Sequence, residues 1–205
     1  MRFLIVTLIS LFSISCSEKE SHDASQHDSM PMVLESDAPG AGDYSIYQVE
    51  SNWHNQNATA LNLSALVGRI QVVAMTYTSC EMSCPRIVAA MKEIEKKANG
   101  QIGFVLVSID PERDDVSTLA AYATKMNLAK SNWNLLTGSS DDVLEIAALL
   151  GVRYQKMPDG EFAHSNIITV LNEEGVIVHQ QNGIAVDLTQ QTSDIVQKLL
   201  ETTAR

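Results

Sequence analysis

Residues 70–98 read IQVVAMTYTSCEMSCPRIVAAMKEIEKKA, and this stretch decides the fold. Its first seven residues form an unbroken run rich in β-branched side chains, which predicts a strand buried on both faces. A short loop holding Cys80 and Cys84 follows. Beyond the loop, apolar residues recur at helical spacing, at Ile87, Met91, Ile94 and Ala98. Asn99-Gly100 then ends the predicted helix.

The rest of the chain repeats this alternation of strands and helices. Strands are predicted over residues 44–49, 102–109, 134–136, 167–171 and 176–180. One helix is predicted where apolar residues form a face, at Leu119, Tyr122, Ala123 and Met126. Two more are predicted from Ser139 or Ser140 to Leu150 and over 187–203, and a single helical turn is predicted in 61–67. Residues 172–175 (NEEG) predict a hairpin between the last two strands. This order predicts an α/β, thioredoxin-like sandwich, with a mixed central sheet flanked by helices.

The first sixteen residues, MRFLIVTLISLFSISC, have the pattern of an export signal. Arg2 precedes an apolar run, 3–12, that is too short to span a bilayer. The segment resembles a bacterial lipoprotein signal, in which Cys16 becomes the lipidated first residue. A cleaved signal and a short anchor are the alternatives, and both also imply export. We therefore expect a protein of the cell envelope, held to a bacterial membrane by lipid and facing the periplasm or the exterior.

Residues 17–43 are polar, with Pro and Gly near their end, and predict a disordered tether. The folded domain then covers 44–205. The tether contains His22, His27, Met30 and Met32. A solvated linker explains these side chains, but imidazole and thioether are also copper ligands, so a mobile copper-collecting arm is the alternative.

Charge and cysteine content narrow the function. The net charge is −11 and the chain has no basic stripe, which argues against a nucleic-acid partner. The chain has three cysteines, and two remain if Cys16 carries lipid. A disulfide between Cys80 and Cys84 would close a small loop and add little stability. A redox couple or a metal site explains this pair better than a structural disulfide does.

The position of the pair also favours reactive chemistry. Pro85 suits the first position of a helix, which places Cys80 and Cys84 at a helix N-terminus. The partial positive charge there favours the thiolate, the form that attacks disulfides and binds soft metals. A metal site needs a third ligand, and His164 stands directly before a predicted strand, in a loop that approaches this helix in a thioredoxin-like fold. His54 and His179 are less well placed. Two cysteines and one histidine suit copper, and also zinc with a fourth ligand.

Three stretches resemble the Sco/SenC copper chaperones of cytochrome c oxidase assembly. They are TYTSCEMSCPRIVAAM (76–91), VSIDPERDDVSTLAAYA (107–123) and HSNIITVLNEEGVIV (164–178). The resemblance covers residues 44–198 and implies copper ligation by Cys80, Cys84 and His164. It also implies that the two cysteines cycle between dithiol and a Cys80–Cys84 disulfide. Asp110 would support the site, or alternatively serve as a helix N-cap before Pro111.

The chain departs from the family pattern at two places. Some members have an acidic residue directly before the ligand histidine, whereas this chain has Ala163, so Glu161 or Asp159 would have to support His164 instead. Between the cysteines, where members often have Pro-Asp, this chain has Glu81-Met82-Ser83. The charge of Glu81 would favour a bound cation and oppose thiolate formation.

The resemblance implies an envelope metallochaperone, not an enzyme, that delivers copper to the dinuclear copper centre of an oxidase subunit. The first alternative is a thiol–disulfide oxidoreductase, which needs both cysteines but not His164. A peroxiredoxin-like peroxidase and a copper or redox sensor are further alternatives. The expected partners are the copper-accepting oxidase subunit, a thiol–disulfide reductase and the membrane.

Overall fold

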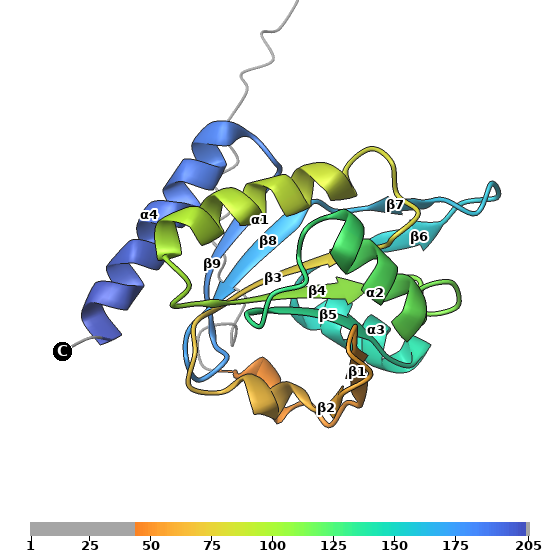
Figure 1. Cartoon of the computed structure of the whole chain (residues 1–205), viewed down its shortest axis with the longest axis horizontal. Helices are drawn as coiled ribbons and strands as arrows, with labels where there is room; N and C mark the ends of the chain where they lie inside the picture. Colours follow the sequence, from red (N-terminus) through yellow and green to blue (C-terminus); the bar gives the residue numbers. More distant parts are fainter. Residues whose placement is uncertain (1–43, 204–205) are drawn as a thin grey trace, which may run out of the picture. The chain divides into compact units, whose positions relative to one another are not determined.

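A computed structural model describes residues 44–203 (Figure 1). The predicted signal segment with Cys16, and the predicted tether with its His and Met residues, lie outside the described residues and stay predictions. Within the described part, no helix combines the length and the apolar character that a membrane crossing requires.

A mixed seven-stranded sheet forms the centre of the described part, in the order β2-β1-β5-β4-β3-β8-β9. Its strands are β1 (Trp53–Asn55), β2 (Ala60–Leu61), β3 (Gln71–Thr76), β4 (Gly103–Ser108), β5 (Trp133–Thr137), β8 (Ile167–Leu171) and β9 (Ile177–Asn182). The strands β3, β4 and β5 run parallel, whereas β8 is antiparallel to β3 and β9 to β8. The predicted mixed sheet is therefore confirmed.

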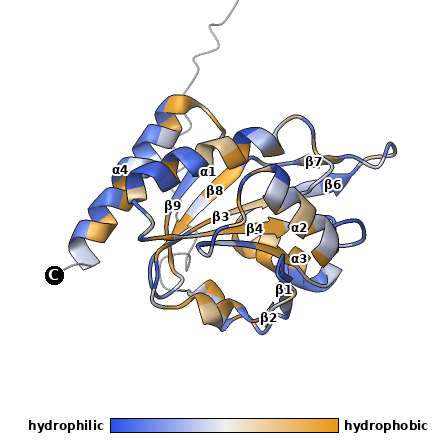
Figure 2. Cartoon of the chain, viewed as in Figure 1, coloured by the Kyte–Doolittle hydropathy of each residue, from blue (hydrophilic) through white to orange (hydrophobic). Residues whose placement is uncertain are grey.

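Helices cover both faces of this sheet (Figure 1). The buried side chains of α1 (Cys84–Ala98), α2 (Val116–Lys125) and α4 (Val186–Thr203) pack into one core. Those of α3 (Ser140–Leu149) and of the 3₁₀ helices η1 (Ile46–Gln48) and η2 (Leu63–Leu66) pack into a second core. Apolar colouring is concentrated in the middle strands, and polar colouring on the outward faces of the helices (Figure 2).

The middle strands contribute to both cores, as their apolar runs predict. In β3, Val72 and Ala74 belong to the core under α1, whereas Val73 and Met75 belong to the opposite core. Successive side chains of a strand point to opposite faces, so only a continuous apolar run can bury both. The strand ends at Thr76, where the cysteine loop begins.

Two predicted elements differ from the structure. The strand expected at 44–49 is wrong, because Ser45 makes a single bridge to Val176 and its hydroxyl accepts the Tyr47 N–H, which starts η1 instead. The last helix exists as predicted, but Thr192 and Ser193 are among its buried residues, whereas Leu199 and Leu200 are half-buried. The hydroxyls of Thr192 and Ser193 donate to backbone carbonyls one turn earlier, which makes the burial of these polar side chains possible.

A hairpin that the sequence does not predict stands apart from the main sheet. Its strands β6 (Tyr154–Lys156) and β7 (Phe162–His164) pair only with each other, and they extend from one end of the molecule (Figure 1). Strands of three residues are too short to carry an alternating pattern that could reveal them. The hairpin matters because His164 is the last residue of β7.

Candidate metal centre

The two cysteines lie in and after the loop that joins β3 to α1. Cys84 is the first residue of α1 and Pro85 follows it, which confirms the predicted position at a helix N-terminus. The backbone N–H of Cys84 donates to Cys80 Sγ at 3.4 Å. Both side chains are buried and both thiols are free. The helix start therefore directs a backbone donor at one of the two sulfur atoms.

The ring of His164 is held in the orientation that a ligand needs. Its Nδ1 lies 3.1 Å from the carbonyl oxygen of Ser165, and because a carbonyl can only accept, Nδ1 carries the proton. In the neutral ring, Nε2 then has a free lone pair. Nε2 lies 3.6 Å from Cys84 Sγ and 3.2 Å from Ser83 Oγ. The ring of Tyr77 packs edge-on against the imidazole, with centroids 5.9 Å apart.

These contacts bring the predicted trio together. One ligand atom from each of Cys80, Cys84 and His164 lies within 4.8 Å of the other two, and within residues 44–203 no other group of three such side chains meets this condition. The other two described histidines lie elsewhere. His54 is exposed on β1, and Nε2 of His179 is hydrogen-bonded to Thr192 Oγ1 at 3.1 Å. Two sulfur atoms and one imidazole nitrogen form a set that suits a soft metal ion.

The surroundings give the two thiols opposite properties. Burial raises the pKa of Cys80, but donors directed at its sulfur, from the Cys84 backbone, the Ser83 hydroxyl and the Cys84 thiol, outweigh burial and lower the pKa to about 6. Burial raises the pKa of Cys84 well above its usual range, and the neighbouring Cys80 thiolate adds to this effect. At neutral pH, the metal-free pair therefore carries one thiolate, on Cys80.

A hollow of about 610 Å³ leads from solvent to the centre. Cys80 and His164 line it, together with the carboxyl-bearing residues Glu81 and Glu161 and with Met82, which is 83% exposed. A metal ion or a partner's side chain can reach the sulfur and nitrogen atoms from this side.

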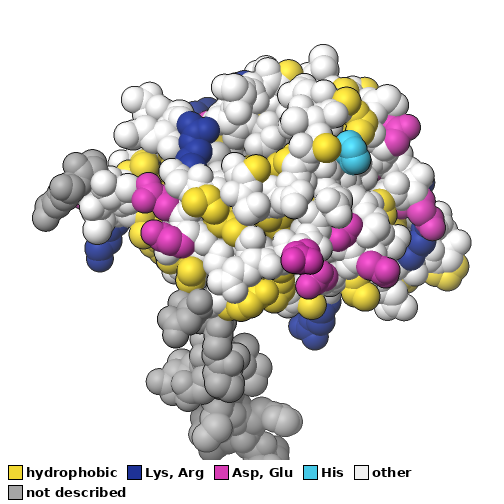
Figure 3. Space-filling model, turned by 90° about the horizontal axis from the view of Figure 1, so that it is seen from below, with side chains coloured by type: hydrophobic (Ala, Val, Ile, Leu, Met, Phe, Trp, Pro, Cys, Tyr) yellow, Lys and Arg dark blue, Asp and Glu magenta, His cyan; other side chains and the backbone are white. Residues whose placement is uncertain are grey.

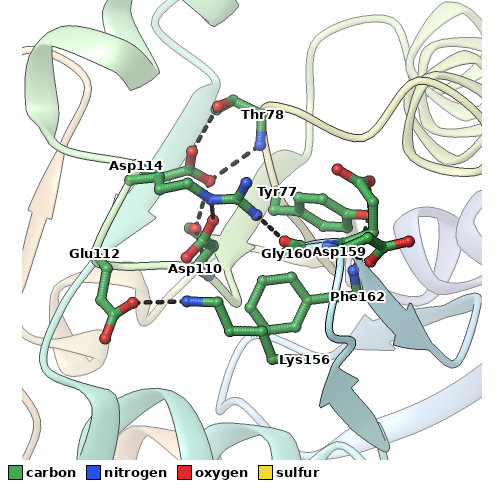
Figure 4. Close-up of polar contacts among 12 residues, drawn as sticks. Tyr77, Thr78, Asp110, Glu112, Asp114, Lys156, Asp159, Gly160 and Phe162 are labelled. Atoms are coloured by element: carbon green, nitrogen blue, oxygen red, sulfur yellow. Dashed lines mark hydrogen bonds and ion pairs between the residues drawn. The ribbon is translucent and has the colours of Figure 1, made fainter.

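Asp110 lies near the centre but does not cap a helix. Its buried carboxylate accepts from Arg113 Nε, whereas the N-cap of α2 is Asp115, whose side chain accepts from the Thr118 N–H at 2.7 Å. The alternative prediction of Asp110 as the cap is therefore wrong. The residue that reaches the cysteine loop is Asp114, which accepts from the Thr78 N–H at 3.0 Å and from the Thr78 hydroxyl (Figure 4).

The residues proposed to support His164 also differ from expectation. Glu161 accepts from the Tyr77 hydroxyl at 2.8 Å, and Asp159 accepts the Glu161 N–H, so neither is hydrogen-bonded to His164. Sequence reasoning missed Ser83, Tyr77 and Asp114 as parts of the site. All three lay inside the quoted motif stretches, Tyr77 and Ser83 in 76–91 and Asp114 in 107–123, but their contacts with the centre depend on the tertiary structure.

Comparison with known proteins agrees with this geometry. Residues 46–201 match the SCO1/SenC family. The SCO1 protein homolog of Bacillus subtilis is 29% identical over 145 residues, which cover 67% of this chain and 75% of that protein.

Solved structures share the fold. A SCO1/SenC family lipoprotein from Bacillus anthracis is 25% identical, with a TM-score of 0.68 over 75% of this chain and 95% of that one. The copper-bound structure of Bradyrhizobium japonicum ScoI is 20% identical, with a TM-score of 0.62 over 73% and 96%. Because the match to the family spans most of the length of this chain, the chain belongs to the SCO1/SenC family.

Proposed function

We propose that this protein is an exported copper chaperone, which binds one copper ion through Cys80, Cys84 and His164 and passes it to the copper centre of an oxidase subunit. The convergence of two sulfur atoms and one imidazole nitrogen carries this proposal. Membership of the SCO1/SenC family and the copper bound in the related ScoI structure support it.

The donor set suits copper in either oxidation state. Two thiolates and one imidazole match the trigonal preference of Cu(I), and Cu(II) would accept one further ligand. Cys80 already provides a thiolate at neutral pH. Cys84 is protonated in the metal-free protein, so copper binding there releases its proton, because only the thiolate is a strong metal ligand.

The open side of the centre suits transfer to a partner. Cys80 and His164 face the hollow, so the thiols of an acceptor can approach the ion there while α1 still holds Cys84. Exchange between two soft sites then proceeds by replacing one ligand at a time. An oxidase subunit with cysteine ligands is the acceptor that fits this chemistry.

Export and anchoring belong to the same proposal. Cys16, which lies outside the described residues, would carry the lipid, and residues 17–43 would tether the domain to the membrane. The related protein of Bacillus anthracis is described as a lipoprotein. Labelling with a radioactive fatty acid in a bacterial host, compared with Cys16→Ser, tests this part of the proposal.

Copper stoichiometry in the reduced protein tests the centre. We expect one tightly bound copper per chain, with a thiolate-to-copper charge-transfer band when loaded with Cu(II). Cys80→Ser, Cys84→Ser and His164→Ala should each lose this site, because two ligands alone hold copper weakly. His179→Ala is the matched control, since His179 bonds to Thr192 and not to the centre. Full copper retention in His164→Ala would contradict the proposed ligand set.

The unequal thiols favour a second candidate, a thiol–disulfide reductase. The Cys80 thiolate would attack a partner's disulfide and form a mixed disulfide, releasing one partner thiolate. Cys84 would then lose its proton and displace the second partner thiolate, leaving a Cys80–Cys84 disulfide. This chemistry does not need His164. Disulfide exchange that survives in His164→Ala, together with absent copper binding in the wild type, would favour this candidate.

A further inference from the structure

The hairpin that carries His164 needs support from outside itself. Its two strands form a separate sheet, and an isolated two-stranded hairpin is at best marginally stable in water. His164 stands at the end of β7, where Tyr154 pairs with it. The contacts that hold the hairpin therefore determine how far His164 lies from the two cysteines.

Arg113 links the hairpin to the loop after β4 through three contacts, and its partners Asp110, Gly160 and Phe162 are labelled in Figure 4. Its Nε donates to the buried carboxylate of Asp110, which anchors the guanidinium in the loop after β4. Its Nη2 donates to the carbonyl oxygen of Gly160, in the turn of the hairpin, at 2.6 Å. The same guanidinium lies over the ring of Phe162, 6.0 Å from the centroid. One side chain thus joins the main body of the domain to both the turn and the second strand of the hairpin.

Tyr77 and Glu112 also attach the hairpin, and the Tyr77 hydroxyl donates to Glu161 while its ring lies edge-on to His164. Tyr77 accepts the N–H of Phe162 at 3.2 Å, and its ring packs against the Phe162 ring with centroids 5.2 Å apart. Lys156 pairs with Glu112 at 2.7 Å, but both side chains are largely exposed, so water and salt weaken this pair. Lys156 Nζ also lies over the Phe162 ring, 5.8 Å from its centroid. Lys156→Gln therefore removes a cation from this ring but leaves the contacts of Arg113 with Asp110 and Gly160, which makes it the control for those two hydrogen bonds.

We propose that Arg113 is a positioning residue that holds the β6–β7 hairpin, and with it His164, over the cysteine loop. This inference rests on the proposed copper site. Arginine suits the position because its planar fork can donate to Asp110 and to Gly160 at once, from two different nitrogen atoms, and a lysine ammonium cannot reproduce this geometry.

Arg113→Gln and Arg113→Lys in the full chain test the proposal, with Lys156→Gln as the control. In the reduced, metal-free protein, amide hydrogen exchange across residues 154–164 should be faster in both Arg113 variants than in the wild type and the control. Copper affinity, measured by competition with a chelator, should fall by about 10- to 100-fold in Arg113→Gln, as for other residues that orient metal ligands. Unchanged hairpin exchange in both Arg113 variants would overturn the proposal.

A double-mutant cycle separates positioning from general destabilisation. If Arg113 acts through His164, Arg113→Gln weakens copper binding in the wild-type background but leaves unchanged the weak residual affinity that the two cysteines retain in His164→Ala. An equal loss in both backgrounds would overturn the proposal. Arg113→Lys keeps a cation beside Asp110 and serves in the cycle if Arg113→Gln does not fold.

Failure of the proposed function and failure of the positioning role give different experimental results. A wild-type protein that binds no copper refutes the proposed function, and hairpin exchange in the metal-free protein then still decides whether Arg113 holds the hairpin. A wild-type protein that binds copper, beside an Arg113→Gln variant of equal affinity, leaves the proposed function intact and overturns the positioning role.

Discussion

Ser83 lies next to all three side chains of the centre, although it is not one of the predicted ligands. Its hydroxyl lies 3.6 Å from Cys80 Sγ and 3.2 Å from His164 Nε2, and it immediately precedes Cys84. A hydroxyl has one proton, so it can donate to only one of these two acceptors at a time. When it donates to Cys80, it stabilises the thiolate, which is one cause of the lowered pKa of that residue.

Alkylation by iodoacetamide should reveal this thiolate. In the reduced, metal-free protein, we expect Cys80 to react increasingly fast as the pH rises through about 6, because its thiolate forms there, and to level off above that pH. Cys84 should stay largely unmodified at neutral pH, because burial raises its pKa. Mass spectrometry of the labelled peptide gives both rates. A midpoint for Cys80 labelling near pH 9, the ordinary pKa of the thiol, would contradict the lowered pKa of Cys80.

Ser83→Ala should move the midpoint for Cys80 upward. The substitution removes a donor to the thiolate but leaves the Cys84 backbone donor in place. The same pH series of labelling measures the shift. Ser79→Ala is the matched control, because Ser79 lines the hollow without a side-chain hydrogen bond to either cysteine. No shift in Ser83→Ala would show that the hydroxyl donates to His164 instead.

At the scale of elements, the centre depends on the loops that follow the parallel strands. The carboxyl ends of β3 and β4 lie at one edge of the sheet, so the loops after them are neighbours. Asp114, fully buried, ties these loops together by accepting from Thr78 and from the Ser108 hydroxyl at 2.6 Å. Thr78 stands two residues before Cys80, so this carboxylate holds the cysteine loop against β4.

Asp114→Asn should destabilise the domain by about 1–3 kcal/mol, since an amide nitrogen would face donors and leave buried groups unpaired. Urea unfolding of the reduced protein measures the loss. Asp115→Asn is the control, because Asn and Asp are equally good N-caps and the free energy of unfolding should hardly change. Equal stability of Asp114→Asn and the wild type would contradict the role of this carboxylate.

At the scale of the whole molecule, the candidate centre joins segments that are far apart in the sequence. Cys84 and His164 are 80 residues apart, one at the start of α1 and the other on the separate hairpin. The acidic side chains that give the chain its charge are scattered between uncharged ones on the face shown in Figure 3. The centre, in contrast, offers two sulfur atoms and one imidazole nitrogen as candidate ligands.

Copper should therefore stabilise the entire domain. A ligand that binds only the folded state adds about 2.7 kcal/mol when its free concentration is 100 times Kd. For a domain of this size, that amounts to a rise in Tm of roughly 5–10 °C. Calorimetry of the reduced protein with and without Cu(I) checks the shift. Cys84→Ser should show no comparable rise, and an equal rise in that variant would place the copper elsewhere.

The sequence by itself determined the layered fold and which three side chains, those of Cys80, Cys84 and His164, form the candidate centre. Long apolar runs can be buried only as central strands, and helical spacing places the helices between them, so local pattern was sufficient for β3, β4, β8 and α1. The cysteine spacing and the histidine before β8 likewise identified the three side chains that the structure brings together.

Only the tertiary structure decided the details that depend on partners distant in the chain. The β6–β7 hairpin exists through Arg113, Tyr77 and Phe162, which no local pattern relates to one another. Asp110 and Asp114 look alike in the sequence, yet one binds Arg113 and the other binds the cysteine loop. Hydrogen bonds and ion pairs of this kind depend on atoms meeting in three dimensions, whereas burial of an apolar run depends mainly on its own composition.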